Sequence, residues 1–154
     1  MGQADPIPWL VEELVPHAAP MILIDDVLEC GEDMLKTRVL IHENSMFYCD
    51  FKGVPSWAGV EYMAQTVAAL AGVRAKKANK PIRVGFLVGA RRYECAVPMF
   101  PLGQKLDIIV RDVFADNGMG VFDCEIQSDQ GEQLATARLN VYLPQDVSGQ
   151  KGQS

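Results

Sequence analysis

One carboxylate lies near the start of the most apolar stretch of the sequence. Residues 55–72 read PSWAGVEYMAQTVAALAG, in which Glu61 is the only charged residue, and the next charge along the chain is Arg74. Among apolar helix neighbours, desolvation favours the protonated form of a glutamate, which suits a general acid. The alternative is structural, because a carboxylate in the first turns also complements the positive end of the helix dipole. Glu61 is therefore the first candidate for a catalytic residue.

Residues on either side of Glu61 are candidates for substrate contacts. The unpaired backbone N–H groups of a helix start, from Ser56 to Gly59, can polarise a carbonyl group on which negative charge develops. Gln65, one turn later, is either a buried hydrogen-bonding residue or a residue that positions a water molecule. Trp57 also joins this set, although it fits core or dimer packing better than a substrate contact.

The composition excludes several classes of protein. A formal net charge of −6 over 154 residues argues against nucleic-acid binding, because phosphate contacts demand a basic surface. No apolar run is long enough to span a bilayer, and the first residues lack a signal-peptide pattern, so we expect a cytoplasmic protein without a membrane span. The four scattered cysteines have the pattern of reduced thiols, not of zinc ligands, and no metal or redox cofactor is implied.

The elements that must position these residues follow from periodicity and turn residues. Asp5 and Pro6 predict a short helix over 6–14. A second, long helix is expected over 57–78, where Pro81 stops it. Alternating runs and Gly-containing turns predict strands at 21–30, 34–43, 82–95, 104–115, 119–128 and 132–143.

Together these elements predict the fold class. A long helix with almost no polar face must be covered all round, and an antiparallel sheet of about six strands can curve around it. This α+β arrangement is the hotdog fold, in which a second copy usually completes the cover of the helix. We expect one such domain over 1–145 and a flexible polar tail over 146–154.

Three segments resemble one family in the same order. VPHAAPMILIDDVLE (15–29) resembles the opening of the 3-hydroxyacyl-[acyl carrier protein] dehydratases of the FabZ and FabA kind. EYMAQTVAALAG (61–72) resembles their helix segment, and PLGQKLDI (101–108) resembles their strand entry. Within that superfamily, PSWAGVEYMAQ looks most like the ApeP-like branch, which is associated with aryl polyene lipid biosynthesis.

The resemblance implies a site and shows one departure from it. Family members carry a catalytic histidine on the loop before the helix, which acts as the base, whereas the helix carboxylate, here Glu61, handles the hydroxyl side. In this chain the loop reads YCDFKGVPS and has no histidine. Asp50 takes the histidine's place when the loop is counted forward, and Phe47 takes it when the loop is counted back from Glu61. Asp50 is therefore a second catalytic candidate, although aspartate is common in turns.

Further roles are implied by the same resemblance. The acyl chain would lie in an apolar tunnel beside the helix, with Met63, Phe86 and Phe122 as lining candidates. The substrate would be a thioester of an acyl carrier protein or of coenzyme A. Basic residues either dock an acidic carrier protein or are routine surface charges; they are Arg74, Lys76, Lys77, Arg91 and Arg92.

Three hypotheses for function follow. The first is a dehydratase subunit, working as a homodimer or with a histidine-bearing hotdog homologue, because in the resembled dimers each site takes its histidine from one chain and its carboxylate from the other. The second is a hotdog thioesterase in which the helix carboxylate activates water. The third is a non-catalytic subunit that binds an acyl chain or stabilises a partner.

Overall fold

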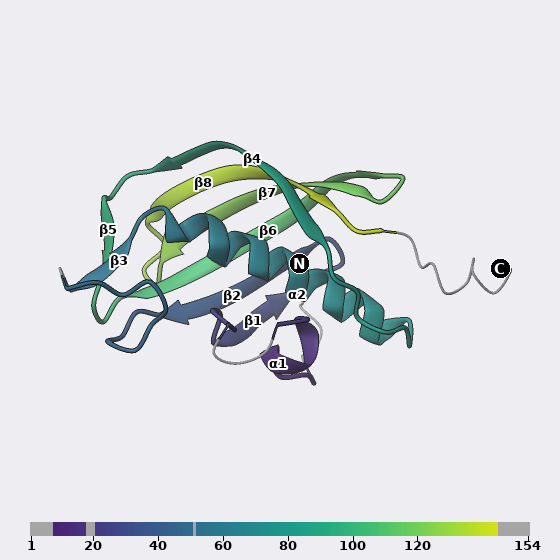
Figure 1. Ribbon diagram of the computed structural model, residues 1–154, viewed down its shortest axis with the longest axis horizontal. Coiled ribbons are helices and arrows are strands. Elements are labelled where there is room, and N and C mark those ends of the chain that lie inside the picture. Colours follow the sequence, from purple (N-terminus) through teal and green to yellow (C-terminus); the bar gives the residue numbers. More distant parts are fainter. Residues whose placement is uncertain (1–7, 18–20, 51, 145–154) are drawn as a thin grey trace, which may run out of the picture.

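The computed structural model describes residues 8–17, 21–50 and 52–144 (Figure 1). The elements in chain order are α1 (Val11–Leu14), β1 (Asp26–Cys30), β2 (Met34–Leu40), β3 (Gly53–Pro55), α2 (Ala58–Lys77), β4 (Phe86–Cys95), β5 (Met99–Pro101), β6 (Lys105–Asp116), β7 (Met119–Ser128) and β8 (Gln133–Tyr142). The predicted tail over 146–154 lies outside the described residues.

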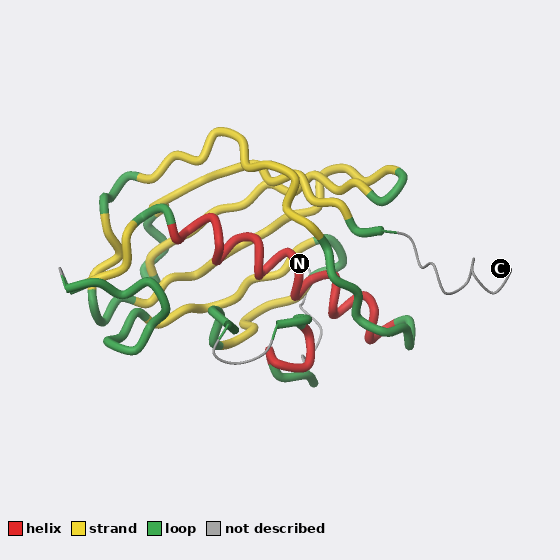
Figure 2. The backbone as a smooth tube through the Cα atoms, in the orientation of Figure 1, coloured by secondary structure: helices red, strands yellow, loops and turns green. Residues whose placement is uncertain are grey.

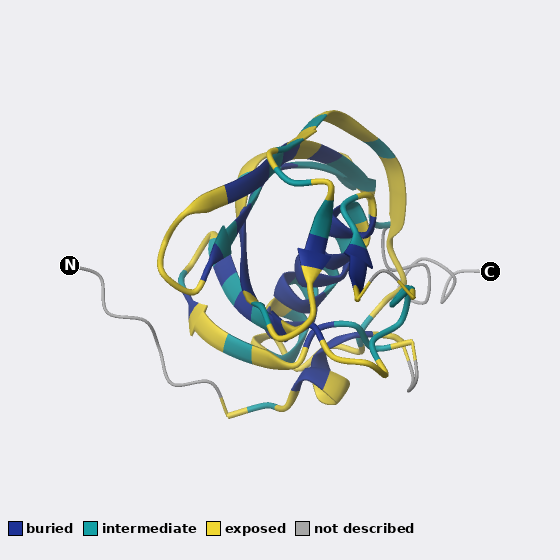
Figure 3. Cartoon of the chain, turned by 90° about the vertical axis from the view of Figure 1, so that its left-hand side faces the viewer, coloured by how far each residue is buried: buried dark blue, intermediate teal, exposed yellow. Residues whose placement is uncertain are grey.

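An antiparallel sheet of six strands curves around α2 (Figures 1 and 2). Its strand order is β1-β2-β6-β7-β8-β4, so β1 and β4 form the two edges. Seen from the end of the molecule, the buried part of α2 lies inside the curl of the strands (Figure 3). The predicted curved sheet of six strands around one central helix is therefore confirmed.

Both hairpin turns predicted from Asn and Gly are present. Asn117 and Gly118 join β6 to β7 with φ values of 50° and 84°, and Gly131 lies between β7 and β8 with a φ of 89°. These left-handed values suit glycine and asparagine, which adopt them at low cost.

Two strands begin four or more residues later than predicted. The strand predicted over 21–30 begins at Asp26, because the residues before it bond to a helix side chain that is described below. The strand predicted over 82–95 begins at Phe86. Its ladder with β8 starts at the Phe86 and Tyr142 pair, where β8 ends, so the preceding residues have no strand to join.

Two further boundaries differ from the predictions, and one small sheet was not predicted. β2 ends at Leu40 and not at 43, because the His42 N–H turns away from the sheet to bond the Ser45 hydroxyl oxygen at 2.9 Å. The described part of the first helix covers only Val11–Leu14, and its predicted cap at Asp5 lies outside the described residues. A small sheet of β3 and β5 was not predicted, because three-residue strands are too short to show a period.

One side of α2 packs into the core. Tyr62, Thr66 and Val73 are buried on this side, and the Thr66 hydroxyl lies 2.8 Å from that of Thr37 on β2. Gly72 faces α1, where an added Cβ would overlap the Leu14 backbone carbonyl. Within the described ranges, no helix combines the length and apolar character needed to cross a membrane.

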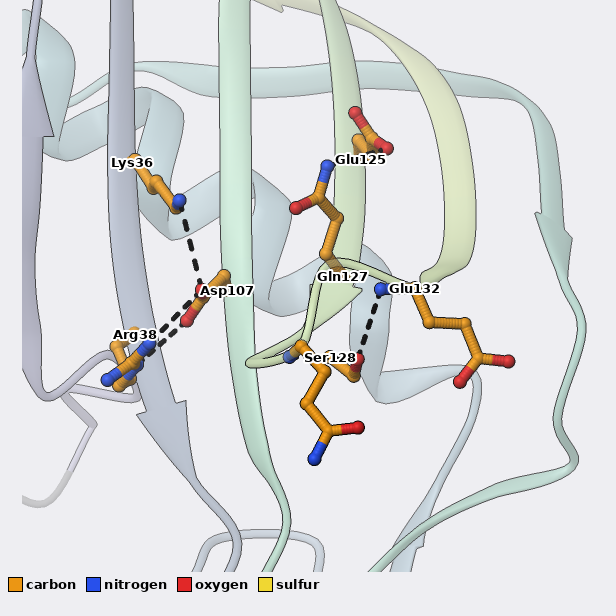
Figure 4. Close-up of polar contacts among 8 residues, drawn as sticks. Lys36, Arg38, Asp107, Glu125, Gln127, Ser128 and Glu132 are labelled. Carbon is orange, nitrogen blue, oxygen red and sulfur yellow. Dashed lines mark hydrogen bonds and ion pairs between the residues drawn. The ribbon is translucent and has the colours of Figure 1, made fainter.

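The outer face of the sheet carries charged side chains in cross-strand contacts. Asp107 on β6 accepts hydrogen bonds from the Arg38 guanidinium on β2, at 2.7 and 3.1 Å, and the Lys36 ammonium lies 3.9 Å from it (Figure 4). The Asp107 side chain is only 6% exposed, and its hydrogen bond raises the pKa of Arg38. These contacts tie β2 to β6 on the face away from α2.

Candidate active site

A cavity of about 930 Å³ runs along one face of α2. Small helix residues at intervals of three and four form its floor, namely Ala64, Ala68, Ala71, Ala75 and Ala78. Residues three and four apart share one helix face, so these side chains leave a continuous groove. The other walls come from the segments before β1 and β4, from the loop before α2 and from the ends of β7 and β8.

Glu61 lies in the wall of this cavity, in the first turns of α2. Its side chain is exposed, and the structure shows no hydrogen bond or ion pair from it to another described residue. The predicted shielding of Glu61 from water is therefore wrong for the single chain. The reason is that the chain's own sheet covers only the opposite side of α2. The carboxylate is available to a ligand in the cavity.

Gln65 is buried and holds the strand-like segment before β1 against α2. Its Oε1 accepts the N–H groups of Leu23 and Ile24, at 2.6 and 3.1 Å, and its Nε2 donates to the Met21 carbonyl at 3.0 Å. Met21 and Leu23 also line the cavity. Of the two predicted roles, the geometry favours that of a buried hydrogen-bonding residue, which fixes one cavity wall.

The start of α2 differs from the predicted set of unpaired N–H groups. The Ser56 N–H bonds the Pro98 carbonyl at 3.1 Å, and the Gly59 N–H bonds the Ser56 carbonyl at 3.0 Å. Gly59 is buried towards the sheet, where an added Cβ would overlap the Tyr93 hydroxyl. These two backbone groups are therefore already used, and packing explains the glycine.

The loop before α2 places neither a histidine nor Asp50 at the cavity. Asp50 is exposed in a turn and is not among the lining residues. Phe47 does line the cavity, and its ring packs edge-on against Trp57 with 5.0 Å between ring centres. Counting the loop back from Glu61 puts Phe47 at the histidine's place, and counting it forward puts Asp50 there. Only Phe47 of these two residues lies beside the cavity. Among the described lining residues, the only histidine is His17, from the segment after α1.

One of the three predicted acyl-lining residues lies where it was expected. Phe122 lines the cavity, whereas Met63 is fully buried in the core and Phe86 is 55% exposed on the edge strand. Arg74 lines the cavity but is engaged, since its guanidinium bonds Asp112 at 2.8 Å. Sequence reasoning missed the alanine stripe, although its spacing of three and four was visible.

Solved structures with the same fold identify the class of protein. A chain of the dehydratase heterocomplex ApeI:P from Xenorhabdus doucetiae superposes with a TM-score of 0.85 and 31% identity, covering 90% of this chain and 93% of that chain. The E. coli PaaI protein and a hypothetical thioesterase from Streptococcus pneumoniae TIGR4 each give a TM-score of 0.61, at 13% and 10% identity, which shows the fold alone. The protein is a hotdog-fold dehydratase subunit.

Sequence relatives give the particular family. Residues 9–151 match the ApeP-like family, described as ApeP dehydratase, and the chain belongs to it. The 3-hydroxyacyl-[acyl-carrier-protein] dehydratase FabZ of Cereibacter sphaeroides (strain ATCC 17025) is 31% identical over 141 residues, which cover 87% of this chain and 88% of the relative. FabZ of Roseobacter denitrificans is 32% identical over 83 residues, and this match spans about half of each chain, 51% and 55%.

Proposed function

We propose that this chain supplies Glu61 to the active site of a 3-hydroxyacyl thioester dehydratase, and that a histidine-bearing hotdog subunit supplies the base. One observation carries the proposal. Glu61, which has no hydrogen bond or ion pair to any described residue, lies in the wall of a largely apolar cavity. The loop beside it, which bears the base in the resembled enzymes, presents Phe47 in its place.

The reaction needs two proton transfers. A base removes a proton from the carbon next to the thioester carbonyl, and an acid delivers a proton to the leaving 3-hydroxyl group, so that water leaves and a carbon–carbon double bond forms. Glu61 fits the second role, either directly or through a water molecule. The acyl chain would extend over the alanine floor of the cavity towards Phe122. Binding an apolar chain along this path requires no charged group.

The missing base leads to the proposal of a dimer. The exposed edge strand β4 offers a free side to a second subunit, and the residues just before and at its start, Val84 and Leu87, also line the cavity. A subunit seated there would cover the open side of α2 and bring its own loop towards Glu61. The structural relative from Xenorhabdus doucetiae is a heterocomplex, which supports a partner that differs from this chain.

Substrate and location are proposed on separate grounds. The FabZ relatives are named for acyl-carrier-protein substrates, which supports a carrier-protein thioester of fatty acid or aryl polyene type; a coenzyme A thioester is the alternative. None of the four cysteines forms a disulfide in the described part of the chain, which supports a reducing compartment such as the cytoplasm.

The test compares the chain alone with the chain mixed with a histidine-bearing hotdog dehydratase encoded next to its gene. Each sample receives 3-hydroxyacyl thioesters of carrier protein and of coenzyme A, and saturated acyl thioesters. We expect water loss only in the mixture, and a decrease of about 10²- to 10⁴-fold with Glu61→Gln, because one proton transfer loses its group. Glu132→Gln, an exposed turn residue outside the cavity, is the matched control and should leave the rate unchanged.

Other outcomes would replace the proposal. Water loss by the chain alone that disappears with His17→Asn would make His17 the base and remove the need for a partner. Release of free acid by the chain alone would indicate a thioesterase. No turnover in the mixture, together with a more soluble partner, would indicate a non-catalytic subunit.

A further inference from the structure

We propose that Tyr93 on β4 is a positioning residue for the dehydration, because its hydroxyl holds the turn from which the helix that carries Glu61 begins. The inference rests on the proposed function and deepens it, since it names a residue outside the cavity that controls where the carboxylate lies. Tyr93 does not line the cavity, so it acts through the helix and not through contact with the substrate.

The Tyr93 hydroxyl bonds the backbone just before α2. It donates a hydrogen bond to the Ser56 carbonyl oxygen at 2.5 Å. The same oxygen accepts the Gly59 N–H at 3.0 Å. A carbonyl oxygen has two lone pairs, so both acceptor positions of Ser56 are filled. The hydroxyl therefore joins β4 directly to the turn that leads into the helix.

Packing at this point leaves the hydroxyl little freedom. Tyr93 is half-buried and packs against the core. An added Cβ on Gly59 would overlap the Tyr93 hydroxyl and crowd the Ile126 side chain, so the glycine makes room for the hydroxyl between helix and sheet. Desolvation by burial raises the pKa of Tyr93. The hydroxyl therefore remains a hydrogen-bond donor throughout the neutral pH range.

A bulge in β4 directs Tyr93 towards the helix. The register of β4 with β8 breaks between Arg91 and Glu94. As a result, Arg92 and Tyr93 stand opposite the single residue Ala137. Arg92 has a φ of 56°, a left-handed value that is uncommon for residues other than glycine. Bulges of this kind re-aim a side chain, and here the side chain that follows the strained residue reaches the start of α2.

Other bonds hold the neighbouring backbone whether or not the hydroxyl is present. The Ser56 N–H donates to the Pro98 carbonyl at 3.1 Å. The short strands β3 and β5 pair at the end of the molecule where α2 begins (Figure 1). Loss of the hydroxyl would therefore not unfold this region. It would free the Ser56 carbonyl, and with it the first turn of α2, to move relative to the sheet.

Glu61 depends on this turn for its position. Its side chain has no hydrogen bond or ion pair to any described residue, so the placement of the helix backbone sets where the carboxylate can lie. Gly59 and Glu61 are two residues apart, which places their side chains about 200° apart around the helix. Gly59 faces Tyr93, whereas Glu61 faces the cavity. Tyr93 therefore supports the helix from the side opposite to the carboxylate, and a shift of the turn moves the carboxylate.

Proton transfer is sensitive to such a shift. An acid must lie within hydrogen-bond reach of the group that it protonates, and a misplacement of about 1 Å can lower a rate by about 10²-fold. Substrate binding depends instead on the cavity walls, which Tyr93 does not form. Removing the hydroxyl should therefore lower kcat and leave KM nearly unchanged.

The test is Tyr93→Phe, which removes the hydroxyl and keeps the ring. The variant is mixed with the histidine-bearing partner, and dehydration of a 3-hydroxyacyl thioester of the carrier protein is measured. We expect kcat to fall about tenfold, with KM within about twofold of wild type. Tyr142→Phe is the matched control, because Tyr142 is exposed and its hydroxyl has no hydrogen bond to a described residue; it should leave both constants unchanged.

A double variant shows whether Tyr93 acts through Glu61. In a Glu61→Gln background, Tyr93→Phe should lower the remaining rate by less than about twofold, because residues that act as a unit are not additive. A full tenfold loss in that background, an unchanged kcat in the single variant, or an effect confined to KM would overturn the proposal. A rate that Glu61→Gln leaves unchanged would instead overturn the proposed function, and this inference with it.

Amide hydrogen exchange of the chain alone gives a readout that needs no turnover. The Gly59 and Val60 N–H groups bond the carbonyl groups of Ser56 and Trp57, so they report directly on the turn. In Tyr93→Phe they should exchange several-fold faster, while amides in the middle of β6 keep their wild-type rates, because the opening is local. Unchanged exchange at both positions would contradict the proposed role of the hydroxyl.

Discussion

The side chain of Gln65 is expected to contribute about 3 kcal/mol to folding stability, because it makes three hydrogen bonds to one backbone segment and each contributes roughly 0.5–1.5 kcal/mol. Gln65→Leu removes all three bonds while keeping the side chain's size. The N–H of buried Ile24 is left without a partner. The loss of folding free energy should therefore not fall below about 1.5 kcal/mol, the lower end of the three contributions together. The segment that forms one cavity wall would also be released.

Urea unfolding followed by tryptophan fluorescence measures this loss. The unfolding midpoint should decrease with little change in slope, and the melting temperature should fall by about 6–12 °C for a chain of this size. Gln133→Leu is the matched control, because Gln133 is exposed and, among the described residues, its side chain bonds only Glu125; its effect should stay within about 0.5 kcal/mol. A loss of less than about 1.5 kcal/mol for Gln65→Leu would refute the reasoning.

Three further perturbations test the packing. Gly72→Ala should destabilise the protein by about 1–3 kcal/mol in urea unfolding despite alanine's better helix propensity, because its Cβ meets the Leu14 backbone; a stabilised variant would contradict this. Burial raises the pKa values of the Tyr62 and Tyr93 hydroxyls, so both stabilise the fold below about pH 10 and lose that contribution as pH rises further. Melting temperatures should therefore fall above that pH, and less steeply for Tyr93→Phe. Asp107→Ala removes a buried partner of two guanidinium bonds and should cost about 2–3 kcal/mol; an unchanged urea midpoint would disagree.

Local chain chemistry was enough to predict most of the elements. The Asn and Gly turns flank strands whose apolar residues alternate, and both signals act within a few residues, so the β6–β7 and β7–β8 hairpins and their bounds agree with the structure within one or two residues. The composition of the segment 57–78 likewise required a buried helix, and Ala58–Lys77 is helical. A long apolar helix followed by four strands has few ways to bury its surface, which is why the curved sheet was also foreseeable.

The site depended on contacts between distant parts of the chain. Gln65 meets its partner Leu23 across 42 positions of sequence, and no local pattern specifies such a contact. Periodicity could not show which side of α2 the sheet would cover, so the exposure of Glu61 was mispredicted. The sequence by itself determined the lone carboxylate Glu61, the helix that carries it and the loop without a histidine, because these are matters of residue type and period. Only the tertiary structure decided that Glu61 opens onto a cavity and that Asp50 does not, because burial depends on which surfaces the folded chain brings together.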